Sequence, residues 1–283
     1  AAAGSIGKQT GFIIRQGLIK KPGQLFLAMS ALMPEPVSNT FHQCAAWADI
    51  LLDLLYPPLC RSCGERLEKH DGRNICPACW SRIQPVPEPS CTVCGAPAET
   101  PLPEGRPCIL CPEGEIYFDR AAAVALYSGV MRDCIHWFKF RFKKDLHKSL
   151  GALLQAGFQE KYPAEQFDAV IPVPLHWTRQ RQREFNQAKL LAQALAAQHS
   201  LPLMDKLLIR GRRTRPQSRL GRAVHRRKNI QGAFKVIKPE EVKNRSLLLI
   251  DDLYTSGNTV NECARVLKKA GANRVCVLTL ARA

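Results

Sequence analysis

The segment Leu247–Val260 constrains the fold of this chain more than any other part of the sequence. It reads LLLIDDLYTSGNTV: four apolar residues, two adjacent aspartates, and then a turn rich in hydroxyl groups. The apolar run predicts a buried strand. Cys263, Val266 and Leu267 keep helical spacing within Asn261–Lys269, so a helix is expected after the turn. A strand, a loop and a helix N-terminus in this order are typical of a parallel α/β sheet.

The turn has the composition of a phosphate-binding loop. Backbone N–H groups at a helix N-terminus suit a phosphate dianion, and Gly257 lets the backbone approach the anion without an intervening Cβ. Asp251 and Asp252 lie within reach of vicinal hydroxyls on the same ligand, and such a carboxylate pair is costly without a partner. A plain strand followed by a capped helix is the alternative. The predicted phosphate loop consists of Thr255, Ser256, Gly257, Asn258 and Thr259.

This segment resembles the signature of the type I phosphoribosyltransferases, which bind phosphoribosyl pyrophosphate (PRPP). The resemblance implies that Asp251 and Asp252 contact the ribose hydroxyls as catalytic residues, and that the loop holds the 5′-phosphate. It also implies Mg²⁺ bound together with PRPP. Thr255 stands where purine-salvage members often have an aspartate, so a 6-oxopurine salvage enzyme is not expected. The sequence contains neither a P-loop nor a dinucleotide-binding fingerprint.

Alternating strand and helix patterns extend upstream of this segment. They predict an α/β fold, a type I phosphoribosyltransferase-like parallel sheet flanked by helices, with the ligand at the carboxyl ends of the strands. The other expected strands are Ala121–Tyr127, Asp168–Pro174 and Arg274–Leu280, and the other expected helices are Met131–Phe142 and Asn186–Gln198.

Arginines follow the strand that ends at Pro174. Arg179, Arg181 and Arg183 alternate along the chain, and on a loop such side chains can converge on a diphosphate. We therefore expect the pyrophosphate side of the pocket here and include Arg213 from the next basic stretch. An exposed basic turn is the alternative.

That basic stretch spans residues 206–238, which contain twelve Lys or Arg and no acidic residue. Such a run repels itself and favours an anionic partner, because ordinary surfaces mix both signs of charge. In phosphoribosyltransferases this position is a mobile loop that closes over pyrophosphate. The run is also long enough to follow a nucleic-acid backbone, and the net charge of +17 favours a polyanionic partner as well.

Eight of the twelve cysteines form four C-x-x-C pairs. This spacing places two thiolates on one side of a tight turn, and two such pairs bind a tetrahedral metal. Four thiolates favour Zn²⁺, with an iron–sulfur centre as the alternative. Since no ligand position remains open for water, we expect two structural zinc sites. The predicted ligands are Cys60, Cys63, Cys76 and Cys79 in the first ribbon, and Cys91, Cys94, Cys108 and Cys111 in the second.

Sequential pairing resembles a double zinc ribbon, and interleaved pairing is the alternative. Gly64 and Gly95 each follow a cysteine pair and permit the positive φ that such knuckles use. His70 is surplus to the ligand count. The single cysteines are expected to be core thiols; they are Cys44, Cys134, Cys263 and Cys276.

Four regions are expected along the chain. Residues 1–40 form a tail or upstream extension, 41–58 an amphipathic helix, 59–112 the double zinc ribbon, and 113–283 the phosphoribosyltransferase-like domain. No apolar run approaches the about 18 residues that a membrane span needs. A cytoplasmic location is expected, because paired thiolates need a reducing compartment.

Several motifs narrow the resemblance to the ComF/GntX-type competence family, whose members carry a cysteine-rich zinc module before a phosphoribosyltransferase-like domain. The resemblance covers residues from about 50 to 283 and implies a PRPP-binding protein linked to DNA uptake or utilisation, with DNA-uptake proteins as partners. The motifs are Pro172–Pro174, Arg183–Gln187, Arg213–Gln217 and Asn229–Phe234, besides the segment above.

Three functions remain open at this point. The first is a phosphoribosyltransferase acting on an unidentified acceptor. The second, which we favour, is a PRPP-binding protein that handles single-stranded DNA, with the cationic run and Phe138, Phe140 and Phe142 contacting the strand. The third is a zinc-ribbon adaptor that keeps a non-catalytic phosphoribosyltransferase fold.

Overall fold

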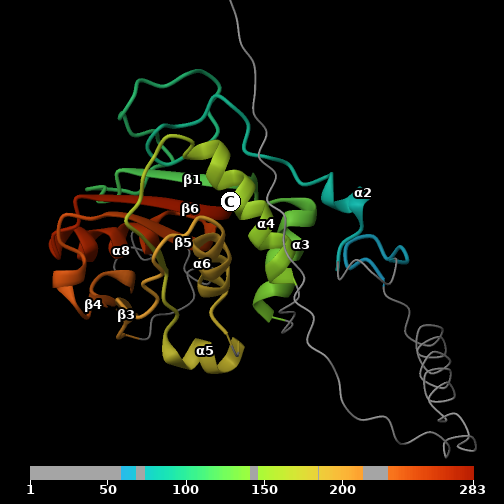
Figure 1. Ribbon diagram of the computed structural model, residues 1–283. Helices are drawn as coiled ribbons and strands as arrows, with labels where there is room; N and C mark the ends of the chain where they lie inside the picture. Colours follow the sequence, from blue (N-terminus) through green and yellow to red (C-terminus); the bar gives the residue numbers. More distant parts are fainter. Residues whose placement is uncertain (1–58, 68–73, 141–145, 184, 213–228) are drawn as a thin grey trace, which may run out of the picture. The chain divides into compact units, whose positions relative to one another are not determined.

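The computed structural model describes residues 59–67, 74–140, 146–183, 185–212 and 229–283 (Figure 1), all within one compact unit, Leu52–Ala283. The predicted tail and the helix expected at 41–58 lie outside the described residues. So do Cys44, His70, Phe142 and Arg213 with most of the cationic run.

A four-stranded sheet has the order β1-β6-β5-β2, with every neighbouring pair parallel. The predicted parallel sheet is therefore confirmed. Its strands read as nearly continuous apolar runs because helices cover both faces. The strands are β1 (Arg120–Leu126), β2 (Ala169–Pro172), β5 (Ser246–Tyr254) and β6 (Arg274–Arg282).

The strand predicted from the apolar run Leu247–Ile250 is longer than expected, because the acidic pair lies inside the strand and not at its end. β5 continues to Tyr254, and Asp251 pairs with Thr279 of β6. The ladder goes on because β6 itself runs to Arg282 and offers a backbone partner at each step. Asp251 and Asp252 are therefore held by a rigid strand, and only the residues after Tyr254 form the loop.

Two hydrophobic clusters lie on the two faces of the sheet. Leu248 and Ile250 belong to one cluster with residues of α3, α4 and α6, whereas Leu247 and Leu249 belong to the other with residues of α8. This separation follows from the alternation of side chains along a strand. Figure 1 shows α3 and α4 at one end of this view of the sheet and α8 at the other. The helices are α3 (Gly129–Phe140), α4 (Leu146–Lys161), α6 (Gln187–Gln198) and α8 (Asn258–Lys269).

Shorter elements complete the described part. β3 (Leu208–Arg210) and β4 (Phe234–Val236) form an antiparallel pair. Arg212, two residues after β3, donates hydrogen bonds to the carbonyls of Asn229 and Gln231, which precede β4. Three further short helices are α2 (Pro77–Trp80), α5 (Trp177–Arg183) and a 3₁₀ turn at Pro239–Glu241.

The segments carrying the cysteines pack directly onto the sheet. The N–H of Ala121 in β1 donates to the carbonyl of Val93 at 2.8 Å. Gly95 lies so close to β1 that a Cβ there would stand 2.8 Å from the Ala121 carbonyl oxygen. Cys60, Cys76 and Cys79 belong to the α3/α4 cluster, whereas Cys91 and Cys94 belong to the α8 cluster. The two ribbons thus share the hydrophobic cores of the α/β part. In the part of the chain that the structure describes, no helix is both long and apolar enough to span a bilayer.

Candidate functional site

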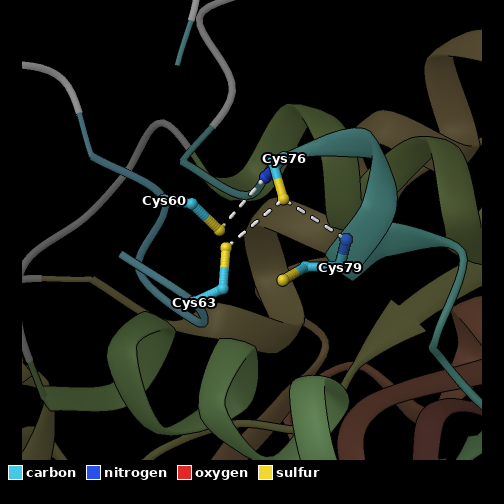
Figure 2. A group of neighbouring side chains, drawn as sticks. All are labelled: Cys60, Cys63, Cys76 and Cys79. Carbon is cyan, nitrogen blue, oxygen red and sulfur yellow. Dashed lines mark hydrogen bonds between the residues drawn. The ribbon is translucent and has the colours of Figure 1, made fainter. Parts of the chain in front are cut away.

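The first cysteine cluster brings together Cys60, Cys63, Cys76 and Cys79. Figure 2 shows the four sulfurs pointing toward a common centre, two from the knuckle and two from the start of α2. The sulfurs of Cys63 and Cys76 are 3.6 Å apart. Gly64 has a φ of 82° and its N–H bonds to the Cys60 carbonyl, as predicted for the knuckle.

The second cluster brings together Cys91, Cys94, Cys108 and Cys111. The Cys94 and Cys108 sulfurs are 3.6 Å apart, and those of Cys91 and Cys111 are 3.9 Å apart. Gly95 repeats the role of Gly64, with a φ of 67°. Both clusters have the sequential pairing predicted above, and interleaved pairing is excluded by this geometry.

The two clusters fit zinc in donor chemistry and in size. Tetrahedral zinc with Zn–S bonds of about 2.3 Å places its sulfurs about 3.8 Å apart. The shortest sulfur–sulfur distances, 3.6 to 3.9 Å, match that spacing, and all four sulfurs of each cluster lie within 4.8 Å of one another. Four thiolates leave no position for a reactive water, so both clusters are of the structural type.

Each cluster is accompanied by an arginine. Arg82 donates from Nη2 to the Cys79 sulfur at 2.7 Å. Arg282 of β6 donates from Nη1 to the Cys94 carbonyl at 2.7 Å and from Nη2 to the Leu110 carbonyl at 3.4 Å. Burial raises the pKa of the Cys94 thiol, and the Arg282 charge acts in the opposite direction.

The predicted phosphate loop connects β5 to α8. Gly257 has a φ of 70°, a conformation that glycine adopts without strain. A Cβ at this position would collide with the Tyr254 hydroxyl and come within 2.8 Å of the Pro112 ring. Ser256 Oγ is buried and has no hydrogen-bond partner among the described residues. An orphaned buried hydroxyl beside a helix N-terminus suits an anionic ligand. Thr255 is exposed, Thr259 is partly buried and Asn258 is buried.

Asp251 and Asp252 have different surroundings because neighbouring residues of a strand face opposite ways. Asp252 is 7% exposed and forms an ion pair with Lys139 of α3 at 3.0 Å. Its N–H donates to Asp251 Oδ1 at 2.9 Å. Burial raises the pKa of Asp251 to about 7, the charge of Asp252 adds to the rise, and Lys139 opposes it. A carboxyl that titrates near neutrality is common at functional sites.

The expectation of a loop carrying Arg179, Arg181 and Arg183 is wrong, because these residues belong to helix α5. The sequence from Trp177 to Arg183 lacks Gly and Pro and is rich in Arg and Gln, which favour helix. Arg179 and Arg183, four residues apart, therefore share one face of α5, whereas Arg181 lies on another side.

The three arginines have different neighbours. Arg181 stacks 5.0 Å from the Trp177 ring, and Arg183 bonds to Gln187 at 3.4 Å. Arg179 contributes its charge to the environment of Arg210. Burial first, and then the Arg179 charge, lower the pKa of Arg210 to about 10, against the charge of Asp251.

Two further expectations are settled by burial. Phe138 is fully buried and packs against Phe185, with ring centroids 5.7 Å apart, so it cannot stack on a nucleic-acid base. Cys134, Cys263 and Cys276 are buried, as expected for core thiols.

Lys139, Arg210, Arg82 and Arg282 were not assigned from the sequence. The sequence indicates them only indirectly, because buried carboxylates and thiolates require nearby cations. It does not show which Lys or Arg side chains lie beside those anions.

Two family profiles match this chain. The profile described as double zinc ribbon domain matches residues 51–112, and that described as phosphoribosyl transferase domain matches residues 188–283. The first match contains both cysteine clusters, and the second contains the acidic pair and the phosphate loop.

Several curated proteins are similar over most of their length. Competence protein F of Haemophilus influenzae is 31% identical over 219 residues, which cover 76% of this chain and 93% of that protein. DNA utilization protein YhgH of Escherichia coli O157:H7 is 33% identical over 234 residues, covering 81% and 99%. Competence protein ComFC of Bacillus subtilis is 27% identical over 219 residues, covering 74% and 84%.

Proposed function

This chain belongs to the ComF/YhgH competence family, which joins a double zinc ribbon to a phosphoribosyltransferase domain, and we propose that it binds PRPP with Mg²⁺ at the end of β5. The buried, unpartnered hydroxyl of Ser256 carries this proposal. It stands in the loop that the domain uses for a 5′-phosphate. The N–H groups at the start of α8 and the hydroxyls of Thr255 and Thr259 complete the anion site.

The ribose is bound through the acidic pair. Asp251 and Asp252 accept hydrogen bonds from the vicinal hydroxyls of the sugar. Lys139 supports this role, because its 3.0 Å ion pair holds the Asp252 carboxylate in place. Burial disfavours the ionised form of Asp251 and raises its pKa, so donors from a ligand would stabilise its carboxylate.

The pyrophosphate lies toward the basic side of the site. Arg179 and Arg210 interact through their charges there, and a diphosphate between them would relieve their mutual repulsion. Arg181, Arg183 and Arg213 stay proposed contacts, Arg213 lying outside the described residues. When bound, Mg²⁺ neutralises charge on the pyrophosphate and so favours its departure.

An active phosphoribosyltransferase with an unidentified acceptor is the second candidate. Such a reaction passes through an oxocarbenium-like state, in which positioning and charge stabilisation matter more than proton transfer. Pyrophosphate release measured with a panel of bases separates turnover from binding alone. A third candidate, a zinc-ribbon adaptor with a non-catalytic fold, predicts neither PRPP binding nor pyrophosphate release.

Calorimetric titration with PRPP and Mg²⁺ tests the binding proposal. We expect saturable binding by the wild-type protein and at least a tenfold loss of affinity in Ser256→Ala. The double variant Asp251→Ala/Asp252→Ala should lose binding altogether. Asp133→Ala on α3 is the control for loss of a carboxylate elsewhere. Equal affinities in all four proteins would exclude this site.

We further propose that the protein handles single-stranded DNA in DNA uptake or utilisation, together with DNA-uptake proteins. Helix α5 supports this role. Trp177 is 59% exposed, and Arg181 stacks over its ring. Such a pair of aromatic and cationic groups suits base stacking and phosphate contact. The reduced thiols that both zinc sites require support a cytoplasmic location.

The DNA proposal is tested by the fluorescence anisotropy of a labelled single-stranded oligonucleotide over a range of salt concentrations. Trp177→Ala should weaken binding about tenfold through lost stacking. Arg181→Gln should reduce the salt slope by about 0.7. Arg132→Gln removes one exposed charge from α3 and serves as control. Unchanged DNA binding in both Trp177→Ala and Arg181→Gln would argue against a role for α5.

A further inference from the structure

The two cysteine clusters require counter-charges. Four thiolates and one Zn²⁺ leave two net negative charges, and burying them is costly without a nearby cation. At the first cluster this cation is Arg82 of the same ribbon, which is exposed and donates a hydrogen bond to the Cys79 sulfur. The arginine at the second cluster comes from elsewhere. Arg282 lies 188 residues beyond Cys94 in the sequence and reaches the cluster from strand β6.

Arg282 is held in a buried position between the second ribbon and the sheet. It is 4% exposed, and its guanidinium donates hydrogen bonds to two carbonyls of the ribbon, those of Cys94 and Leu110. Its guanidinium lies over the ring of Tyr254, 4.5 Å from the centroid. This buried cation thus interacts with two neutral carbonyls, with Tyr254 and with the charge of the Cys94 thiolate.

Tyr254 and the ribbon both contact the phosphate loop. A Cβ at Gly257 would meet the Tyr254 hydroxyl and, at 2.8 Å, the ring of Pro112, which directly follows the ligand Cys111. Asn261 in the first turn of α8 adds a second connection. Its side chain accepts from the Tyr117 N–H at 2.7 Å and donates to the Glu115 carbonyl at 2.9 Å.

We propose that the second cysteine cluster is a structural part of the phosphate loop and that Arg282 is the positioning residue that connects them. The cluster holds the guanidinium, the guanidinium holds the Tyr254 ring, and the ring with Pro112 supports the backbone turn at Gly257. The first cluster has no such role, because its cysteines belong to the core on the opposite face of the sheet. The effect on PRPP rests on the function proposed above.

Hydrogen exchange of the backbone amides of residues 255–260 tests the connection directly, without ligand. We expect Arg282→Gln to accelerate exchange in this segment at least tenfold, and Arg82→Gln to leave it unchanged. Tyr254→Leu should reproduce the effect of Arg282→Gln while leaving the second cluster intact. Unchanged exchange in both Arg282→Gln and Tyr254→Leu would overturn the proposal, as would equal acceleration in Arg82→Gln.

A second readout uses the wild-type protein and avoids any folding defect. Because coupling between two binding sites is reciprocal, saturating PRPP with Mg²⁺ should strengthen zinc binding at the second cluster about tenfold and leave the first unchanged. Competition with a chromophoric chelator measures both ions. Equal effects on both clusters would overturn the proposal. If the wild-type protein binds no PRPP, the proposed function fails, and the exchange experiment still decides the role of Arg282.

Discussion

Asp251 and Asp252 are neighbours in sequence, yet they belong to opposite faces of the sheet. Asp252 faces α3 and forms an ion pair with Lys139. The charge of Arg210, at the end of β3, acts on Asp251 and opposes the rise of its pKa. This division gives each carboxyl its own neighbours, and substitutions of those neighbours can be measured in the ligand-free protein.

The first prediction concerns the pH dependence of stability. The pKa of Asp251 is about 7 in the folded protein and near 3.8 when unfolded, so between these values the folded state binds the extra proton. Stability should therefore fall as the pH rises from about 4 to 7, by up to about 1 kcal/mol per pH unit. Asp251→Asn should flatten this slope in urea unfolding. A slope that persists in the variant would refute the assignment.

The second prediction concerns Lys139. The Lys139 side chain is 17% exposed and the Asp252 side chain 10%, so Lys139→Met leaves a largely buried carboxylate without this partner. We expect a loss of about 3 kcal/mol in the free energy of unfolding. Adding Asp252→Asn to Lys139→Met should recover most of that loss, because no unpaired charge remains. No recovery in the double variant would show that Lys139 acts through packing alone.

At the scale of elements, β5, the turn and α8 act as one unit. The apolar half of β5 fixes the strand in the core, and the turn presents N–H groups at the start of α8. The reversal of the chain depends on Gly257, which has a positive φ. Tyr254 and Pro112 occupy the space that a Cβ at this position would need.

The third prediction compares two glycines with similar backbones. Gly257 and Gly232 have φ values of 70° and 68°, but a Cβ meets Tyr254 and Pro112 at Gly257 and open space at Gly232. Gly232→Ala should cost about 1 kcal/mol of stability from its dihedral alone. Gly257→Ala should cost about 2 kcal/mol more and weaken PRPP binding at least tenfold. Equal costs in thermal unfolding would contradict the close packing.

The fourth prediction concerns the two ribbons. Metal analysis of the purified protein should find two zinc ions per chain, since both clusters fit tetrahedral zinc. Cys60→Ser/Cys63→Ser and Cys91→Ser/Cys94→Ser should each retain one. Iron in place of zinc, or a variant that loses both ions, would contradict two independent structural sites.

At the scale of the whole molecule, the ribbons and the α/β part share their cores instead of standing as separate modules. Cys60, Cys76 and Cys79 pack with α3 and α4, and Cys91 and Cys94 pack with the residues around α8. Pro112, the last residue of the expected ribbon region, lies against Gly257 of the phosphate loop. The boundary expected between residues 112 and 113 stays a prediction.

Local patterns in the sequence predicted the features that depend on neighbouring residues. These include the strand–turn–helix unit and the sequential cysteine pairs. Contacts over long separations could not be predicted, because nothing near Cys94 or Asp252 indicates that Arg282 or Lys139 will meet it. Helix α5 was missed for a different reason. Alternating arginines carry no helical period, and the intrinsic preference of Arg and Gln for helix prevailed.

The central claim is that the turn after β5 holds the 5′-phosphate of PRPP. A crystal structure of the protein with PRPP and Mg²⁺ tests it most directly. The account predicts the 5′-phosphate within hydrogen-bond distance of Ser256 Oγ and the N–H groups at the start of α8, with the ribose hydroxyls on Asp251 and Asp252. A phosphate bound elsewhere, with Ser256 Oγ still unpartnered, would contradict it.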